Sequence, residues 1–357
     1  MKRLIILTDE DSEFLVSKAD FKNFTTMDVE RIRNWFLKHS YSVEVLKFRE
    51  LDLRLNYKDV FFLYQTSELP GSFYKRYIED IVWLLEKQGA IVLPSYTYLR
   101  AHENKVLMEL LRLSFRDNSL KTIKSTCYGS WMEAKKHKPE FPVVIKQSTG
   151  SGGDGISLAR NEKEYRRKVR KAGSILIAAG LTGVFVDFSK NITKKIIKFI
   201  QPEKSKYVTY NTTPVSSPLV IQEFIPGLGG DYKVLVFGRK FYCMYRKNRN
   251  HDFRASGSGK FFDVPEEDHE GILSFAHRLT QEVDFPVLGM DIGFDGNKYH
   301  LIEFQMIHLG PSALQRSKFW HEYHDGKWVR YEGTSILEDE FATAIDGYIT
   351  EKYLKSN

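Results

Sequence analysis

The sequence has few cysteines and no hydrophobic run long enough to cross a membrane. Only two of its 357 residues are cysteines, Cys127 and Cys243, which excludes the disulfide framework of small secreted domains. The first residues turn acidic after a short apolar run, so no signal peptide is evident. The longest apolar run, residues 175–186, is too short to span a bilayer. We interpret it as a buried strand or helix, with a peripheral membrane contact as the alternative. We expect a cytoplasmic protein without a transmembrane segment.

The chain also lacks a long basic tract and a Gly-x-Gly-x-x-Gly motif. The net charge of +7 is spread along the sequence, which suits small anionic ligands at least as well as nucleic acid. The missing glycine motif argues against a dinucleotide-binding fold. With 42% hydrophobic residues the composition is that of an ordinary globular protein, and the length suffices for two or three lobes.

The first hundred residues alternate between strand and helix patterns. Such alternation is typical of a small parallel α/β lobe. The apolar periodicity predicts strands at residues 2–8, 42–48, 60–64 and 90–93, and helices at 28–39 and 73–87. It predicts further helices at 101–113, 162–171 and 268–283, and one that begins at a capping box of Ser335 and Glu338 and runs to about residue 354.

Residues 287–311 form the segment around which the rest of the chain is interpreted. Seven even positions are apolar, whereas Asp291, Glu303 and Gln305 fall on odd positions, which predicts a half-buried hairpin. The seven are Leu288, Met290, Ile292, Phe294, Ile302, Phe304 and Met306. Asp295-Gly296-Asn297 is the predicted turn. A three-residue loop places Asp291 opposite Leu301 and all the odd residues on one face. A two-residue loop would put Asp291 on the opposite face, so the prediction requires a loop with an odd number of residues or a bulge.

The odd positions of this hairpin carry Asp291, Glu303 and Gln305. Two carboxylates and a carboxamide oxygen on one face offer oxygen ligands that suit Mg²⁺ or Mn²⁺. A solvated polar face explains the same three residues, so the hypothesis of a metal site depends on the other segments.

A glycine-rich loop follows a predicted strand at residues 141–146, which ends in Lys146. Residues 147–155 read Gln-Ser-Thr-Gly-Ser-Gly-Gly-Asp-Gly, and such a loop exposes successive backbone N–H groups to an anion. A flexible turn is the alternative. The lysine beside the loop favours binding of phosphate.

The region after residue 218 contains strand patterns followed by basic residues. We predict a strand at 219–224 and a hairpin of 232–237 with 240–245. A flexible stretch at 255–259 then lies among Arg246, Arg249, Arg254 and Lys260. These cations form either an anion clamp or a solvated loop.

Two segments carry less information. Residues 187–218 are irregular and basic, and no element is predicted for them. Near the carboxyl terminus, aromatic residues and two histidines, His321 and His324, lie close together in the sequence. The histidines could be metal ligands, but without an acidic pattern beside them we favour packing or a wall of the substrate site.

In their order along the chain, these parts resemble the ATP-grasp superfamily, closest to carboxylate-amine ligases of the glutamate-ligase and D-alanine:D-alanine-ligase type. The resemblance covers nearly the whole chain, most firmly residues 141–155 and 219–311. It implies an α/β protein in which a parallel α/β lobe (1–100) precedes two α+β lobes that clasp ATP. These are a central lobe (101–218) and a C-terminal lobe with the metal site (219–357).

The resemblance also implies roles for individual residues. Lys105 and Lys146 would hold the phosphates together with the mobile loop, which contributes Ser148, Gly150, Ser151, Gly152, Gly153 and Gly155. The strand end of Glu223, Phe224 and Ile225 would meet the adenine, with Gln222 as a further nucleotide contact. Asp231 would meet the ribose. Asp291, Glu303 and Gln305 match the family's triad for Mg²⁺. Arg246 and Arg254 match basic positions that face the transferred phosphate and the acyl intermediate, and we group Lys260 with them as catalytic.

By this resemblance the protein is an ATP- and Mg²⁺-dependent (or Mn²⁺-dependent) ligase. It would join a carboxylate to an amine through an acylphosphate and release ADP and phosphate. The alternatives are a phosphotransferase acting on a small molecule or sugar and a non-catalytic nucleotide-binding module. Expected partners are small acids and amines, such as an amino acid, a peptide or an acidic sugar, but not nucleic acid. A homodimer is the expected assembly.

Three features depart from the family pattern. Gln305 stands where the family usually has Asn. The Pro-Gly turn that follows in the family is displaced here to residues 306–311, which concerns the substrate end of the site. The segment between the glycine-rich loop and Gln222 is longer than usual, which indicates an insertion.

Overall fold

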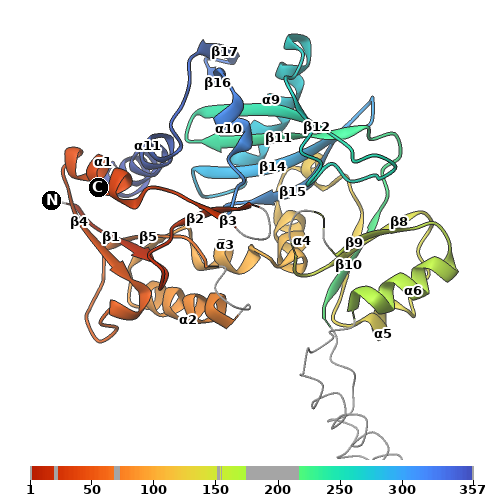
Figure 1. Ribbon diagram of the computed structural model, residues 1–357, viewed down its shortest axis with the longest axis horizontal. Coiled ribbons are helices and arrows are strands. Elements are labelled where there is room, and N and C mark those ends of the chain that lie inside the picture. The colour runs from red at the N-terminus through yellow and green to blue at the C-terminus, as the bar shows by residue number, and fades with distance from the viewer. Residues whose placement is uncertain are drawn as a thin grey trace, which may run out of the picture. The chain divides into compact units, whose positions relative to one another are not determined.

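The computed structural model describes residues 2–19, 23–67, 73–150, 153, 155–173 and 217–355 (Figure 1). The chain forms two compact units: unit 1 comprises Met1–Ile123 and Ile225–Asn357, and unit 2 comprises Lys124–Phe224. The division into three lobes at residues 100 and 218 therefore stays a prediction. The apolar run 175–186, most of the segment 187–218, and the loop residues Ser151 and Gly152 lie outside the described residues.

A parallel four-stranded sheet opens unit 1, as the alternating pattern predicts. Its strands are β1 (Lys2–Thr8), β4 (Tyr41–Lys47), β5 (Phe61–Tyr64) and β6 (Ile91–Leu93), in the order β4-β1-β5-β6. Alternate residues of β1 face opposite sides. Leu4 and Ile6 join the core that includes α1 (Val29–Lys38), and Ile5 and Leu7 join the core that includes α2 (Phe73–Lys87). The two helices thus cover opposite faces of the sheet (Figure 1).

The helix predicted at residues 101–113 is wrong in its first turn. The structure contains two helices here, α3 (Tyr96–Ala101) and α4 (Lys105–Ser114). Glu103 between them has a left-handed φ of 51°, and the side chain of Asn104 accepts a hydrogen bond from the backbone N–H of Leu107 to start the second helix. Lys105 is therefore the first residue of α4.

Unit 1 also contains a seven-stranded sheet and the helices around it. The strand order is β15-β14-β11-β12-β16-β17, with β13 paired to β12. The strands are β11 (Gly230–Phe237), β12 (Lys240–Lys247), β13 (Phe261–Phe262), β14 (Val287–Phe294), β15 (Tyr299–Gln305), β16 (Phe319–His324) and β17 (Lys327–Glu332). The helices are α9 (Glu266–Thr280), α10 (Ser312–Arg316) and α11 (Leu337–Ile349), and a π-helical turn, Thr350–Leu354, continues α11.

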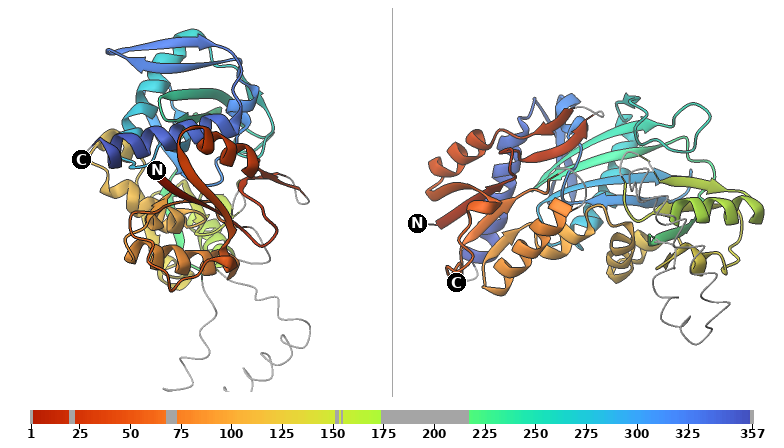
Figure 2. Two further views of the ribbon diagram at one scale, coloured as in Figure 1. Left: turned by 90° about the vertical axis from the view of Figure 1, so that its left-hand side faces the viewer. Right: turned by 60° about the horizontal axis from the view of Figure 1, so that its bottom comes forward.

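Helix α11 lies between the two sheets of unit 1. It packs against α1 and also against β11 and β14 of the seven-stranded sheet, as Figure 2 shows from two further directions. The capping box predicted for its start is wrong. The Ser335 hydroxyl instead forms a hydrogen bond with Tyr242, 2.7 Å away, and the Glu338 carboxylate accepts one from the backbone N–H of Asp28 at 3.0 Å. Contacts with distant segments have replaced the local pattern.

The hairpin of β14 and β15 differs from the prediction in its loop. Phe294 pairs with Tyr299, so four residues connect the strands rather than three. A bulge at Ile302 adds one residue to β15, and Asp291 therefore lies opposite Glu303 instead of Leu301. The bulge supplies the odd parity that the prediction requires. It also exchanges the faces that were predicted for two apolar residues: Leu301 is buried in the core, whereas Ile302 is partly exposed.

Unit 2 is built on an antiparallel sheet in the order β7-β10-β8-β9. Its strands are β7 (Ser125–Tyr128), β8 (Val143–Gln147), β9 (Ile156–Ala159) and β10 (Leu219–Glu223), and α5 (Trp131–Ala134) and α6 (Glu162–Gly173) accompany them. Its core joins Ile145 and Leu219 of the sheet to Tyr165 and Val169 of α6.

Short elements complete the description. The strands β2 (Leu15–Ala19) and β3 (Asn23–Thr26) form a small hairpin, and Phe48–Glu50 and Asn118–Lys121 are 3₁₀ turns. Among the described helices, none combines the length and apolar character needed to cross a bilayer.

Candidate active site

Most of the site residues predicted in unit 1 share one face of the seven-stranded sheet. Asp291 of β14 lies opposite Glu303 of β15 on one side and opposite Lys233 of β11 on the other. Asp231, two residues before Lys233, lies opposite Arg246 of β12. Residues directly opposite or two apart in neighbouring strands point to the same face. Four strands thus bring together charges that are up to 72 positions apart in the sequence, from 231 to 303.

Four of these side chains form a buried network of alternating charge. Arg246 donates two hydrogen bonds to Asp231, from Nε to Oδ1 and from Nη2 to Oδ2, both at 2.8 Å. Its Nη2 also lies 2.6 Å from Asp291 Oδ2, and Lys233 Nζ lies 3.3 Å from Asp291 Oδ1. None of the four side chains is more than 11% exposed. Two cations and two carboxylates offset one another, which is how charges persist in a protein interior.

The two carboxylates of this network differ in acidity. Burial raises the pKa of Asp231 to about 6, and the neighbouring charge of Asp291 adds to the effect, against the opposing influence of Arg246. Burial acts in the same direction on Asp291, but Arg246 and Lys233 outweigh it and lower the pKa of Asp291 below its usual value. Asp291 therefore stays ionised to a lower pH than Asp231 does.

The residues at Asp291 fit a hard divalent cation. Asp291 Oδ1 is buried and, among the described residues, has the ion pair with Lys233 but no hydrogen bond. Glu303 lies directly across from it, and Gln305 follows two residues later on the same face. The Gln305 Nε2 donates a hydrogen bond to the backbone oxygen of His308 at 2.9 Å, which orients the carboxamide oxygen as an acceptor. Carboxylate and amide oxygens are the ligands that Mg²⁺ prefers.

Lys233 was missed by the sequence analysis. It lies in a strand that is otherwise apolar around it, Tyr232 to Phe237, and its register opposite Asp291 depends on strand pairing over more than fifty residues. A lysine in the middle of a buried strand was the available signal, because such a charge needs a partner.

The basic loop after β12 is organised by pairs within itself. Arg254 forms an ion pair with Asp252, with Nη2 2.6 Å from Oδ2, and Lys260 Nζ donates to Asn250 Oδ1 at 2.6 Å. Of the cations predicted as catalytic, only Arg246 has a described ion pair with Asp291. The role of Arg254 and Lys260 stays a prediction.

Lys105 and Ile225, predicted to contact the nucleotide, also belong to unit 1. Lys105 is the first residue of α4 and is 4% exposed. Ile225 directly follows unit 2 and is partly exposed.

In unit 2, Lys146 and the glycine-rich loop lie together at one end of β8. Lys146 is a buried residue of this strand, paired with Val220 of β10 and Ile156 of β9. The loop closes through a hydrogen bond of 2.9 Å from the Gln147 N–H to the Gly155 oxygen. Gly155 has a φ of 72°, and a Cβ there would overlap Gln147, so only glycine fits.

The rest of this loop and the adenine strand follow the sequence pattern. Gly150 and Gly153 also have positive φ, and Ser148 is buried. Gln222 and Glu223 end β10, and Phe224 follows. The Glu223 N–H donates to the backbone oxygen of Lys124 at 2.9 Å.

The comparisons with known proteins agree on one architecture. The family model of the ATP-binding domain of the carbamoyl-phosphate synthase L chain matches residues 118–223, which span the sheet and the glycine-rich loop of unit 2. A RimK-domain ATP-grasp protein from Sphaerobacter thermophilus DSM 20745 superposes with a TM-score of 0.52 at 11% identity, covering 96% of this chain and 98% of its own. The chain has the ATP-grasp fold. No curated protein sequence matches it significantly.

Two further solved structures cover nearly the whole chain. The D-cycloserine synthetase DcsG covers 97% of this chain and 99% of its own, with a TM-score of 0.51 and 11% identity. The D-alanine–D-alanine ligase from Bacillus anthracis covers 100% and 98%, with a TM-score of 0.50 and 11% identity. The α/β prediction with an ATP-grasp arrangement is thereby confirmed. At these identities the likeness concerns the fold.

Proposed function

We propose that this protein is an ATP- and Mg²⁺-dependent ligase that joins a small carboxylic acid to an amine. The observation that carries the proposal is the shared sheet face: Asp291, Glu303 and Gln305 offer oxygen ligands beside the buried cations Arg246 and Lys233. Solved structures of this fold include a D-alanine–D-alanine ligase and a D-cycloserine synthetase, whose names describe synthesis from small molecules.

The proposed reaction has two steps. A carboxylate oxygen of the acid attacks the γ-phosphorus of ATP, the bond from that phosphorus to ADP breaks, and an acylphosphate forms. The amine then attacks the acyl carbon, the carbon–oxygen bond to phosphate breaks, and the amine loses a proton as the amide forms. Both steps place negative charge on oxygen, so fixed cations and backbone N–H groups lower the barrier, and no protein nucleophile is needed.

The residues divide this work by chemistry. Lys146 and the backbone of the glycine-rich loop, including Gly150, Gly153 and Gly155, would bind phosphate oxygens, with Ser151 and Gly152 between them in sequence. Lys105 would add a second cation for the phosphates. Bound Mg²⁺, held by Asp291, Glu303 and Gln305, would neutralise charge on the transferred phosphate.

The remaining positions would orient the two ends of the reaction. The backbone from Glu223 to Ile225 would meet adenine, with Gln222 as a further nucleotide contact, and Asp231 would meet the ribose. Arg246, Arg254 and Lys260 would stabilise the acylphosphate and the tetrahedral oxyanion that follows it.

Product analysis tests this proposal. Purified protein is incubated with ATP, Mg²⁺ and pooled acids and amines, with phosphorus products followed by NMR and new species by mass spectrometry. We expect ADP, free phosphate and a dehydrated acid–amine conjugate. Glu303→Ala should reduce the rate by on the order of 100-fold or more with the fold intact by circular dichroism. The matched control is Glu44→Ala, which removes an exposed strand glutamate from a surface ion pair.

Each other outcome has a defined meaning. A stable phosphorylated product without free phosphate identifies a phosphotransferase. Tight ATP binding without turnover in any pool identifies a nucleotide-binding module. Activity that Glu303→Ala retains would place the metal elsewhere.

We also retain as proposals a cytoplasmic location and a homodimer. The proposed partners are small acids and amines, such as amino acids, peptides or acidic sugars, rather than nucleic acid.

A further inference from the structure

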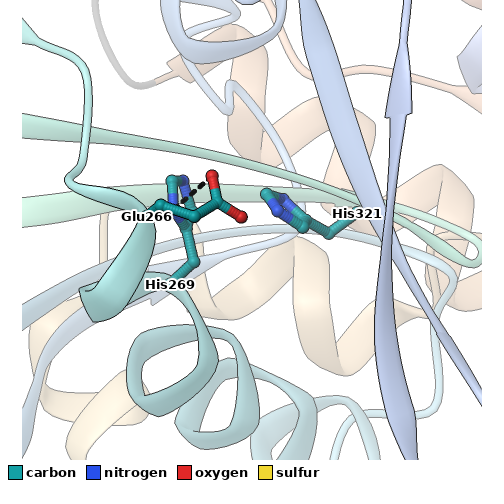
Figure 3. A group of neighbouring side chains, drawn as sticks. All are labelled: Glu266, His269 and His321. Carbon is teal, nitrogen blue, oxygen red and sulfur yellow. Dashed lines mark ion pairs between the residues drawn. The ribbon is translucent and has the colours of Figure 1, made fainter.

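Three potential metal ligands that have no part in the proposed reaction converge at the start of α9. Glu266 and His269 occupy the first turn of α9, three residues apart, and His321 lies in β16 (Figure 3). One ligand atom from each lies within 4.8 Å of the other two. Positions i and i+3 of a helix share a face, which explains why the two α9 side chains point the same way.

Three of the four ring nitrogens of the two histidines lack a hydrogen bond of ordinary geometry among the described residues. Each histidine is 3% exposed. Neither ring nitrogen of His269 has a hydrogen-bond partner among the described residues, nor has Nε2 of His321. A buried polar atom without a partner costs on the order of 1–3 kcal/mol, so a pair of such rings needs an explanation.

Packing alone explains only part of this arrangement. The rings of His269 and His321 lie 4.6 Å apart at 37°, and Phe319 contacts both edge-on. Phenylalanine would fill this space without an unsatisfied nitrogen. A neutral imidazole nitrogen offers a lone pair to a metal, a role that phenylalanine cannot fill.

We propose that Glu266, His269 and His321 form a zinc-class metal site that ties the start of α9 to β16. Two imidazole nitrogens and one carboxylate oxygen suit Zn²⁺ and disfavour Mg²⁺, and three ligands leave a fourth position for water. With bonds of about 2.1 Å, donor atoms of a tetrahedral site are roughly 3.4 Å apart. His269 Nδ1 and Glu266 Oε2 are 3.9 Å apart, and the exposed Glu266 side chain can turn to close this gap.

Charges near this site both favour and oppose the binding of a metal ion. The first turn of α9 carries Glu266, Glu267 and Asp268, which favour a cation. Arg330 competes, because its Nη1 lies 2.6 Å from a Glu266 oxygen. Arg330 is also held by Glu332, 2.8 Å from its Nε, and it lies over the Phe319 ring at 3.7 Å. Zinc would therefore replace one of its contacts and leave the others.

Metal titration of the whole protein tests the site. Protein stripped with EDTA and dialysed is titrated with Zn²⁺ in excess Mg²⁺, which occupies the oxygen ligands around Asp291, and binding is followed by calorimetry. Co²⁺ serves as a second probe through its visible absorption. We expect one Zn²⁺ per chain and a higher unfolding temperature with zinc. His269→Gln and His321→Gln should weaken binding by on the order of 100-fold, and Arg330→Gln should strengthen it.

The controls lie on the same elements. His324→Gln on β16 should bind zinc like the unmodified protein. Glu267→Gln in the same helical turn removes a nearby charge but no ligand, so it should weaken binding far less than the histidine variants. If the buried histidine variants fail to fold, Glu266→Gln answers the question, because that side chain is 63% exposed. No zinc uptake by the unmodified protein, or uptake that survives all three ligand variants, overturns the proposal. The test does not depend on the ligase proposal, since it measures no turnover.

Discussion

Of the residues on the charged sheet face, Arg246 is the one whose removal should lower the free energy of unfolding most. Arg246→Met removes a guanidinium that bonds both carboxylates while preserving much of its volume. Asp231 loses both hydrogen bonds of 2.8 Å, and Asp291 loses a partner at 2.6 Å but retains Lys233 at 3.3 Å. Breaking a buried pair from one side costs roughly 3–5 kcal/mol. We expect a loss of about 4 kcal/mol in the free energy of unfolding, at the middle of that range.

Comparison variants separate this loss from a general effect of mutation. Lys233→Met removes a single, longer contact and should cost about 2 kcal/mol. Arg246→Met combined with Asp231→Asn should recover part of the loss, because the stranded carboxylate is gone. Urea unfolding followed by tryptophan fluorescence reports these differences, since Trp131 is the one tryptophan in unit 2 and the other four belong to unit 1. A loss below about 1 kcal/mol, or a double variant no more stable than Arg246→Met, would refute the reasoning.

The same variant probes the metal site. Without the guanidinium, one cation fewer opposes the binding of Mg²⁺ at Asp291. Mg²⁺ should therefore stabilise Arg246→Met more than it stabilises the unmodified protein. Adding Asp291→Asn should abolish that gain. Equal stabilisation by Mg²⁺ in all three proteins would remove Asp291 from the list of ligands.

Other predictions concern single positions. Gly230→Ala should prevent stable folding, because its Cβ would overlap the backbone of β12, whereas Gly347→Ala in α11, with nothing within 4 Å, should gain up to about 1 kcal/mol in thermal unfolding. Burial holds the pKa of His102 far below its usual range, so as pH falls through about 6.5 only the unfolded state takes up this proton. His102→Gln should therefore flatten the decline of stability between pH 7 and 5; an unchanged slope would contradict this. Gln305→Asn should lose the hydrogen bond to His308 and need more Mg²⁺ for the same thermal stabilisation; unchanged Mg²⁺ dependence would show that this bond does not position the ligand.

Elements with a strong local pattern could be predicted from the sequence. The bounds of β1 and α2 agree residue for residue with the prediction, because apolar periodicity determines both. The break between α3 and α4 could not be predicted, since Glu103 takes a left-handed φ without a glycine or proline to mark it. The sequence analysis did not predict the strands β16 and β17, because a cluster of aromatic residues is compatible with core packing in any secondary structure.

Part of the charged face was also open to prediction, and part was not. The parity of Asp291 and Glu303 follows from alternation once a bulge is allowed, but the bulge at Ile302 itself has no sequence mark. The pairing of Arg246 with Asp231 follows from the predicted hairpin, because its two-residue connection places residue 237 opposite 240 and therefore 231 opposite 246. The pairing of Lys233 with Asp291 depends on the register between β11 and β14, which distant packing sets. For the same reason, the Glu266–His269 spacing was visible in the sequence, but its convergence with His321 was not.

The composition of the charged face suggests why a cation and a polyphosphate would bind together. Three carboxylates, Asp231, Asp291 and Glu303, face two cations, Lys233 and Arg246, so the five groups carry a net charge of minus one when all are ionised. A face of this sign repels ATP. One divalent cation reverses the sign to plus one and turns the same face into an attractive surface. We therefore expect ATP affinity for this protein to fall steeply without a divalent cation. The fold-change on removing the cation should be smaller in Asp231→Asn, which removes one negative charge and a proposed ribose contact but no proposed metal ligand.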